Sequence, residues 1–238
     1  MLKLYKALAI CCMLVFNVAA RAENEYAPQG GDFAIELQFN PFSNNFKTFQ
    51  IDQLAGRYMV NNRDALRFGI GFGIDSSNLT PYPDNSISSE YAETTIGNLS
   101  IDFGYERHFY SHGRIDIYAG VGFGYRYDSA FGKKNEEGYV KYHNISLAID
   151  DDGDFVLGEN RTSHSFRVNA FTGIDFYVYK GLYVGAELGI RLAYTAYPGY
   201  YIEVHDLREI KKYSEHDEFE QISLKTLCEP ALRLGWKF

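Results

Sequence analysis

The sequence predicts an all-β fold, an eight-stranded antiparallel up-and-down transmembrane β-barrel preceded by a signal peptide, and three observations predict it. Apolar and polar residues alternate with a period of two in eight segments, which gives each segment one apolar and one polar face. Aromatic residues, which favour strands, make up 16% of the chain. Beyond the N-terminus, no apolar run approaches the roughly 18 residues that a membrane-spanning helix needs.

The N-terminus has the pattern of a secretory signal peptide. Lys3 and Lys6 precede an apolar run over 7–18, which is too short to span a membrane, and Ala20-Arg21-Ala22 follows as a cleavage site. We therefore expect a signal peptide over 1–22 and a single barrel domain over 23–238. Cleavage would remove three basic and no acidic residues, so the net charge would change from −8 to −11. Such an acidic exported protein is a poor binder of nucleic acid.

The first strand is expected over 33–39 and the second over about 46–60. In the second strand the apolar positions change phase, which indicates a β-bulge near 53–56. The third strand, over 66–75, alternates Leu, Phe and Ile with Arg, Gly and Asp. The other expected strands are 99–109, 115–128, 166–178, 182–194 and 222–238.

Short and long connections alternate along the chain. Short turns are expected at 61–64, 111–113 and 179–181, and the long polar connections are expected at 40–45, 76–91, 129–163 and 196–217. Outer-membrane barrels have this asymmetry, with short periplasmic turns and long extracellular loops. An even number of strands places both ends of the mature chain on the periplasmic side.

The polar face of the strands distinguishes a membrane barrel from a soluble one. In a soluble ligand-binding barrel, Phe68, Phe72, Phe103 and Phe123 would line an internal cavity and the polar face would meet water. That polar face, however, carries many glycines between its charged residues, and each glycine in a strand costs about 0.5–1 kcal/mol. A narrow lumen needs such small residues, so we expect the apolar face to contact lipid.

An eight-stranded barrel is only wide enough for side chains to fill it. Charged residues of both signs alternate inward and can pair, because an unpaired buried charge costs several kcal/mol. The expected lumen network consists of Glu36, Arg57, Arg67, Asp75, Asp102, Glu106, Arg126, Arg167, Asp175, Glu187, Arg191 and Arg233. A lumen filled in this way would not serve as a wide diffusion pore.

Three segments carry a resemblance to a known family: Glu36-Leu37-Gln38-Phe39-Asn40-Pro41-Phe42, Arg57-Tyr58 leading to 66–73, and Leu232-Arg233-Leu234-Gly235-Trp236-Lys237-Phe238. In order and number of strands, the chain resembles small OmpA/OmpX-type outer-membrane β-barrels of Gram-negative bacteria, in particular those of Bacteroidota. The resemblance implies a location in the cell outer membrane, outer-membrane lipid and lipopolysaccharide as partners, and a monomer. It also implies that the terminal strand, with Leu232, Leu234, Trp236 and Phe238, is read by the barrel-assembly machinery. No peptidoglycan-binding domain follows the last strand, so a cell-wall tether is not expected.

Little in the chain indicates catalysis or metal binding. Asp150-Asp151-Asp152-Gly153-Asp154 has part of the spacing of a calcium loop, but the closing glutamate is missing. The six histidines lack metal-ligand spacing and are expected on turns and loops. Cys228, alone after signal cleavage, has no partner for an internal disulfide and is expected to act as a small apolar residue. We therefore expect no enzyme activity, no cofactor and no metal.

The sequence thus predicts an integral outer-membrane barrel with a plugged polar lumen that supports envelope structure and displays acidic extracellular loops. Two alternatives remain open. A narrow channel for small or apolar solutes would need a continuous gap through the lumen. A lipid-modifying enzyme at the rim would need Ser163 or Ser165, His164 and an acid to converge on one spot.

Overall fold

The structure, a computed structural model, describes residues 26–39, 51–80, 91–136, 138–150, 154–205, 210–215 and 217–238. The strands are β1 (Phe33–Phe39), β2 (Ile51–Met59), β3 (Asp64–Leu79), β4 (Tyr91–His112), β5 (Ile115–Glu136), β6 (Gly138–His143), β7 (Ile145–Ile149), β8 (Phe155–Arg161), β9 (Ser163–Tyr179), β10 (Leu182–Tyr197), β11 (Tyr200–His205), β12 (Ile210–Glu215) and β13 (Phe219–Lys237). Among these residues no helix is long and apolar enough to cross a membrane. The expected signal peptide lies outside the described residues.

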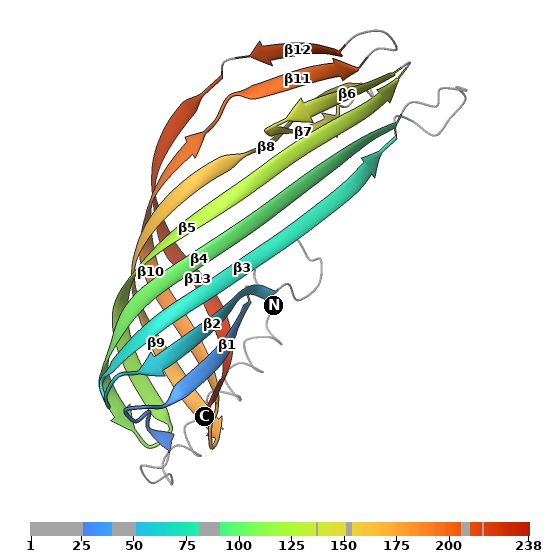
Figure 1. Ribbon diagram of the computed structural model, residues 1–238. Helices are drawn as coiled ribbons and strands as arrows, with labels where there is room; N and C mark the ends of the chain where they lie inside the picture. Colours follow the sequence, from blue (N-terminus) through green and yellow to red (C-terminus); the bar gives the residue numbers. More distant parts are fainter. Residues whose placement is uncertain are drawn as a thin grey trace, which may run out of the picture.

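Eight strands form a closed hydrogen-bonded ring in the order β1-β2-β3-β4-β5-β9-β10-β13, and every neighbouring pair is antiparallel (Figure 1). The ring closes where the first strand pairs with the last, with Leu37 opposite Leu234. The prediction of eight antiparallel strands in up-and-down order is confirmed.

The short connections between β2 and β3, β4 and β5, and β9 and β10 lie at one end of the barrel, which we call the turn end. The C-terminus lies at the same end (Figure 1). Gly113 and Lys180 adopt positive φ angles of 58° and 43° in two of these turns, a conformation that tight turns require. The three connections overlap the turns expected from the sequence.

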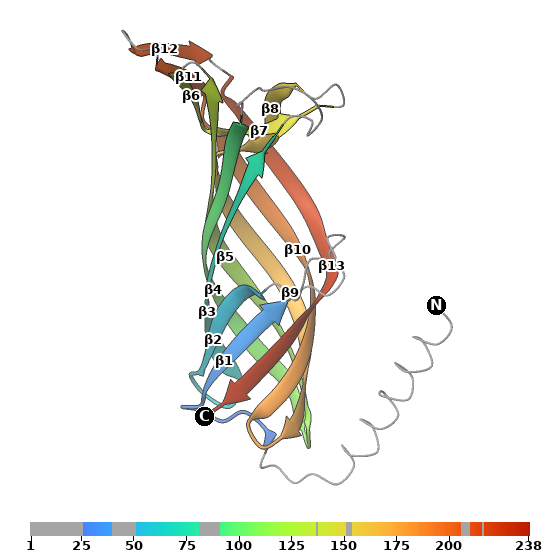
Figure 2. The same cartoon turned by 90° about the vertical axis from the view of Figure 1, so that its right-hand side faces the viewer.

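At the opposite end, which we call the loop end, strands occupy much of 76–91, 129–163 and 196–217, which the sequence predicts as long polar connections. Pairing of β3 with β4 continues to Leu79 and Ala92, and β5 runs on to Glu136. β6, β11 and β12 then extend the sheet on one side, and the β7–β8 hairpin lies on the other (Figure 2). Neither face of this extension is uniformly apolar, so the period-two pattern that marks the ring strands is missing here.

The β7–β8 hairpin is fixed to the sheet. Leu147 is buried against Gly132, where a Cβ atom would collide with the leucine side chain. The Leu147 backbone N–H donates to Thr94 Oγ1 at 3.2 Å, and the Ala130 N–H donates to Thr162 Oγ1 at 3.1 Å. These contacts hold the hairpin as a packed part of the loop end.

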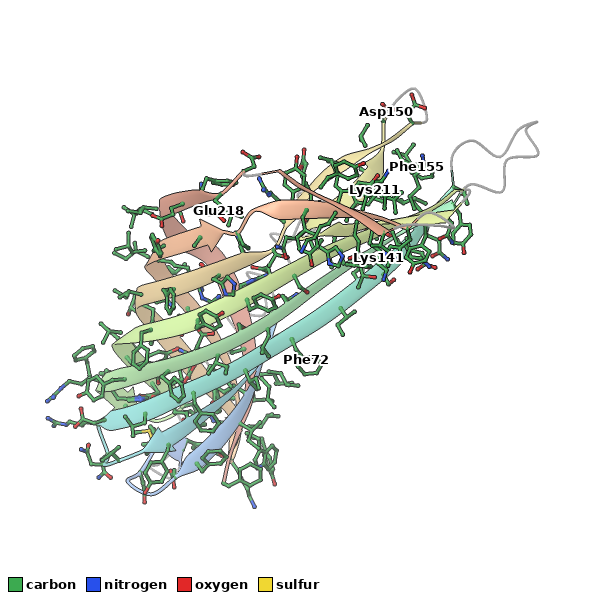
Figure 3. The ribbon with its side chains drawn as sticks, turned by 45° about the horizontal axis from the view of Figure 1, so that its top comes forward. Phe72, Lys141, Asp150, Phe155, Lys211 and Glu218 are labelled. Carbon is green, nitrogen blue, oxygen red and sulfur yellow. The ribbon has the colours of Figure 1, made fainter. Side chains whose placement is uncertain are left out.

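The apolar side chains of the ring point outward. Phe72 is 79% exposed, Phe123 63% and Val168 58%, and Figure 3 shows Phe72 pointing away from the barrel. Phe68 and Phe103 are also exposed on this outer surface, which we call the apolar belt. A soluble barrel with an internal cavity lined by these phenylalanines is therefore excluded.

Two strands depart from regular pairing. Gln38 pairs with Gln53 and Phe39 with Ile51, so Asp52 is the extra residue of a β-bulge, next to the stretch in which the sequence predicts one. In β13 the pairing with β10 shifts between Leu227 and Ala231, where Pro230 cannot donate to the ladder. The side chain of Cys228 lies outside the described residues.

Candidate functional site in the barrel lumen

Seven charged side chains meet inside the barrel towards the turn end, and each comes from a different strand of the ring. We call this group the ion cluster; it consists of Glu36, Arg57, Arg67, Glu106, Asp175, Glu187 and Arg233. All seven were predicted to face the lumen. Only β5 supplies no member, and it contributes Tyr118 and Asp116 beside the cluster instead.

Arg57 lies at the centre of the ion cluster and is 2% exposed. Its Nη2 lies 3.1 Å from Glu36 Oε1, and its Nε lies 2.8 Å from Glu106 Oε2. Its Nη1 donates to Asp175 Oδ2 at 2.6 Å. One guanidinium therefore joins carboxylates from the first, fourth and ninth strands.

Arg233 and Arg67 complete the pairing. Arg233 is fully buried; its Nη2 donates to Asp175 Oδ1 at 2.8 Å, and its Nη1 lies 3.4 Å from Glu187 Oε2. Arg67 Nη1 donates to both Glu106 and Glu187, at 2.9 and 2.7 Å. Buried charges are tolerated only when they are paired and hydrogen-bonded. Every member of the ion cluster has at least two ion-pair partners and at least one hydrogen bond.

Aromatic rings lie flat on the inner wall beneath the ion cluster, and glycines make room for them. Tyr118 lies over Gly173 and Tyr183 over Gly235, and a Cβ atom at either glycine would overlap the ring. The Arg57 guanidinium lies 4.9 Å from the centre of the Tyr118 ring, a favourable cation–π geometry. The Tyr183 hydroxyl donates to Glu36 at 2.6 Å. The lumen glycines thus allow an aromatic layer between the wall and the charges.

The sequence prediction missed one buried pair. His108 Nδ1 lies 2.7 Å from Asp116 Oδ2, and Ser111 Oγ donates to the other carboxylate oxygen of Asp116 at 2.5 Å. The expectation that the histidines lie on turns and loops is wrong for the described ones: His108, which is 3% exposed, lies within a strand, as do His112, His143, His164 and His205. The pairing of β4 with β5 shifts between His108 and Tyr110. In the sequence, the alternation of 115–128 places Asp116 on the inward face, and this was the available indication that a buried partner lies beside it.

A second tier of charges lies nearer the loop end. Arg167 Nη2 donates to both carboxylate oxygens of Asp102 at 2.9 and 3.1 Å, and Arg126 Nη2 lies 2.7 Å from Asp128 Oδ1. Arg191 Nε donates to Asn169 Oδ1 at 2.9 Å. This group, which we call the upper tier, is more exposed, since the Arg126 side chain is 43% exposed.

The predicted single network is therefore two tiers. A cavity of about 80 Å³ lies between them, lined by Arg67, Glu187, Asp102, Asn169 and Arg191 among others. Asp75, which alternation also assigned to the network, is exposed on β3, and within the described residues it has no ion pair. Strand tilt separates the tiers, because residues on the same face of neighbouring strands lie at different heights in the barrel.

The residues considered for a rim enzyme do not converge. Ser163 and Ser165 are buried in the lumen, where Ser165 Oγ lies 2.9 Å from Thr195 Oγ1. His164 points to the outer surface, where its Nδ1 lies 2.7 Å from the Tyr125 hydroxyl. Neighbouring residues of a strand face opposite sides, so this serine–histidine combination cannot act as one site.

The other candidates are placed as follows. Of the possible calcium loop, Asp150 and Asp154 are described and joined by a backbone hydrogen bond of 3.0 Å, whereas 151–153 lie outside the described residues. Within the described part of the chain, no group of three or more His, Cys, Asp or Glu side chains could hold a metal ion. Leu234, Trp236 and Phe238 point outward from β13 and are 40%, 43% and 69% exposed, and the side chain of Leu232 is not described.

A family model described as "Putative OmpA-OmpF-like porin family" matches residues 37–238. The matched region contains all but the first residues of the eight-stranded ring. None of the curated proteins matches the chain.

Three solved structures have low similarity to the chain. Ail, the attachment invasion locus protein of Yersinia pestis, shares 11% identity over 88% of this chain and 100% of its own, with a TM-score of 0.37. The outer membrane protein OprG from Pseudomonas aeruginosa shares 11% identity over 90% of this chain and 98% of its own, also with a TM-score of 0.37. A TodX deltaS2S3 mutant monoaromatic hydrocarbon channel shares 8% identity over 91% of this chain and 90% of its own, with a TM-score of 0.28. These similarities are too low to transfer a role.

Proposed function

Because the chain belongs to the OmpA-OmpF-like porin family of outer-membrane β-barrels, we propose that it is an integral outer-membrane protein whose lumen is closed to solutes. In this proposal it contributes to the structure of the envelope and presents the sheet at the loop end to the outside. It needs no cofactor and catalyses no reaction.

The ion cluster is the observation that carries this proposal. Glu36, Glu106, Asp175 and Arg233 are 0% exposed, so water does not reach these side chains from either side. Passage of an ion would require breaking several paired charges in a site of low dielectric constant, at a cost of several kcal/mol for each charge. The cavity between the tiers ends at the cluster on one side.

The orientation follows from the two ends of the barrel. We propose that the turn end faces the periplasm, with both mature termini, and that the loop end faces outward, because short turns and long loops have these locations in outer-membrane barrels. A signal peptide over 1–22 would deliver the chain to the periplasm. The outer surface would then contact lipid, and the exposed residues of β13 would be read by the barrel-assembly machinery.

The acidic loops expected from the sequence are only part of what would be displayed. Asp150, Asp154 and Glu218 are exposed at the loop end, but the sheet of β5, β6, β11 and β12 also carries five lysines: Lys133, Lys134, Lys141, Lys211 and Lys212. The displayed surface therefore carries both acidic and basic residues.

Conductance of the mature chain in planar lipid bilayers tests the closed lumen. The unmodified protein should give no steady current above that of the bare bilayer. The double variant Glu36→Ala/Arg233→Ala, which removes two cluster members that pair with each other, should give measurable current and serves as the positive control.

The narrow channel remains the second candidate, and the same recording decides between the two. A stable conductance of the unmodified protein, rising with salt concentration and altered by Arg191→Ala at the cavity, would contradict the closed lumen. The variant Arg126→Ala is a matched control, because Arg126 pairs with Asp128 in the upper tier and its loss leaves the ion cluster intact.

A further inference from the structure

The cavity between the ion cluster and the upper tier lies over a row of residues that face the lumen on five neighbouring strands. Arg67 pairs with Gly104, Gly104 with Gly122, Gly122 with Asn169, and Asn169 with Arg191. Cross-strand partners point to the same face, and all five residues line the cavity. The row therefore has a guanidinium group at each end and two residues without side chains between them.

The two glycines of this row keep the space open. The nearest side-chain atom to a Cβ added at Gly122 would be Phe171 Cε1 at 3.8 Å, and at Gly104 it would be Arg67 Cβ at 3.7 Å. Unlike the lumen glycines beneath the tyrosine rings, these two do not make room for a side chain. The cavity of about 80 Å³ holds roughly three to six non-hydrogen atoms, since one water molecule needs about 10–30 Å³.

Arg191 and Asn169 supply hydrogen-bond donors at one side of the cavity. Arg191 Nε donates to Asn169 Oδ1 at 2.9 Å, so the amide nitrogen of Asn169 keeps both of its donors. Within the described residues, no carboxylate oxygen lies within 4.0 Å of the Arg191 guanidinium. Its neighbours in the backbone register are Asn169 and Lys225, and neither is acidic. A guanidinium edge with an adjacent amide suits a carboxylate, which accepts two parallel hydrogen bonds.

Glu187 supplies an acceptor at the other side of the cavity. It precedes Arg191 by four positions on β10, which separates the two Cα atoms by about 13 Å. In the part of the chain that the structure describes, its contacts with Arg67, Arg233 and Tyr118 all involve Oε2. The side chain is 16% exposed and lines the cavity. Its Oε1 can therefore accept a hydrogen bond from a cationic group in the cavity.

The charges on the two sides of the cavity are opposite. The ion cluster has four carboxylates and three guanidinium groups, whereas the upper tier has two carboxylates and three guanidinium groups among the described side chains. Asp102 also lines the cavity, but both of its carboxylate oxygens accept from Arg167 Nη2. A simple anion or cation would be attracted by one side and repelled by the other, whereas a molecule with both charges complements both sides.

We propose that this cavity binds a small zwitterion of the α-amino acid type, with about five or six non-hydrogen atoms. The carboxylate of the ligand accepts from Arg191 and Asn169, and its ammonium group donates to Glu187. Water reaches the upper tier, since the side chains of Arg126 and Asp128 are 43% and 26% exposed, so the ligand enters from the loop end. This proposal goes beyond the proposed function and does not depend on closure of the lumen by the ion cluster.

Equilibrium dialysis of the folded mature chain in detergent against radiolabelled glycine tests the proposal. Glycine should bind with a Kd between about 1 μM and about 1 mM, because so few atoms limit the binding energy. Acetate and methylamine each carry only one of the two charged groups. Each should therefore displace the label at least about tenfold more weakly than unlabelled glycine does.

Two variants test the residues that hold the carboxylate of the ligand. Arg191→Gln removes the guanidinium and should raise the Kd for glycine at least about tenfold. Asn169→Asp keeps the size of the side chain but places a carboxylate against Arg191, and it should raise the Kd at least as much. The control Arg107→Gln is the same substitution in an exposed ion pair with Asp64, outside the lumen, and should leave the Kd within about twofold. Heat-modifiable gel mobility establishes that all three variants are folded.

Four outcomes would overturn the proposal. The first is the absence of saturable glycine binding at millimolar concentrations. The second is displacement by acetate as effective as that by glycine, which would indicate a site for anions alone, and the third is the same result with methylamine, which would indicate a site for cations alone. The fourth is an unchanged Kd in Asn169→Asp. A barrel that binds glycine and also conducts ions would contradict the closed lumen alone, so the two failures are distinguishable.

Discussion

Arg233 of the last ring strand donates a hydrogen bond of 3.2 Å to Glu36 of the first, 197 positions earlier in the chain. These two strands form the seam at which the barrel closes, with Glu36 opposite Gly235 and Gln38 opposite Arg233. The ion pair lies on the inner side of that seam, and both side chains are 0% exposed. The seam is therefore held by backbone hydrogen bonds and, from the lumen, by paired charges.

Arg233→Met should destabilise the barrel by about 3–5 kcal/mol, because it leaves buried carboxylates without a partner. Arg126→Met is the same substitution in an exposed ion pair, with Asp128, and should cost only about 0–1 kcal/mol. Urea unfolding in lipid vesicles, followed by fluorescence of the single Trp236, measures both. Equal destabilisation by the two changes would mean that the ion cluster does not hold the seam.

The sequence was sufficient to predict the eight antiparallel strands of the ring. Period-two alternation carries this information, because one face of each ring strand meets an apolar surrounding. Leu66 and Arg67 illustrate the point: the first is 51% exposed on the outer surface, and the second joins the ion cluster.

The partners within the lumen could not be predicted. Arg57 and Asp175 are 118 positions apart and belong to strands on different sides of the ring, and their contact depends on strand tilt and register. The sheet at the loop end was missed for another reason. Lys133, Lys141 and Lys212 lie on a face that does not contact an apolar surrounding. Their strands therefore lack the alternation of apolar and polar residues on which the prediction depended.

Gly173→Ala should destabilise the barrel by about 1–3 kcal/mol, since its Cβ atom would overlap the Tyr118 ring. In a Tyr118→Leu background the same change should cost at least about 1 kcal/mol less, because the ring that causes the overlap is gone. Urea unfolding of the four proteins of this double-mutant cycle gives the coupling energy. Additive effects would contradict the inferred contact.

The stability of the barrel should fall in acid partly through Asp64, which lies at the turn end outside the apolar belt. Hydrogen bonds from the Tyr105 hydroxyl and from the Asn61 side chain lower the pKa of Asp64 below its ordinary value of 3.8. A lowered pKa means that the ionised carboxylate stabilises the folded state above about pH 4 and that this contribution is lost as the pH falls through the lowered pKa.

Asp64→Asn should remove this part of the pH dependence, and Tyr105→Phe should reduce it. Unfolding midpoints measured from about pH 6 to about pH 2 test this, with Asp154→Asn at the loop end as the control. A pH profile of Asp64→Asn that matches that of the unmodified protein would show that the carboxylate does not contribute.

The protein should be recovered from outer membranes as a heat-modifiable band, because a closed barrel in detergent migrates differently before and after boiling. N-terminal sequencing of this band should start at Glu23 if the signal peptide spans 1–22. A soluble periplasmic protein without a mobility shift would contradict the proposed orientation and location together, whereas a different first residue would change only the cleavage site.

Phe238→Ala should reduce the amount of protein in outer membranes of living cells without changing the stability of the refolded barrel. The Phe238 ring is 69% exposed, and its backbone N–H donates to the Phe33 carbonyl at 2.8 Å, a hydrogen bond that alanine retains. Loss of an exposed ring costs within about 0.5 kcal/mol, so any larger effect in cells must arise during assembly. Phe72→Ala is the matched control, because Phe72 is 79% exposed in the apolar belt but lies far from the C-terminus. Equal yields of the two variants in cells would contradict a role of the terminal aromatic residue in recognition by the assembly machinery.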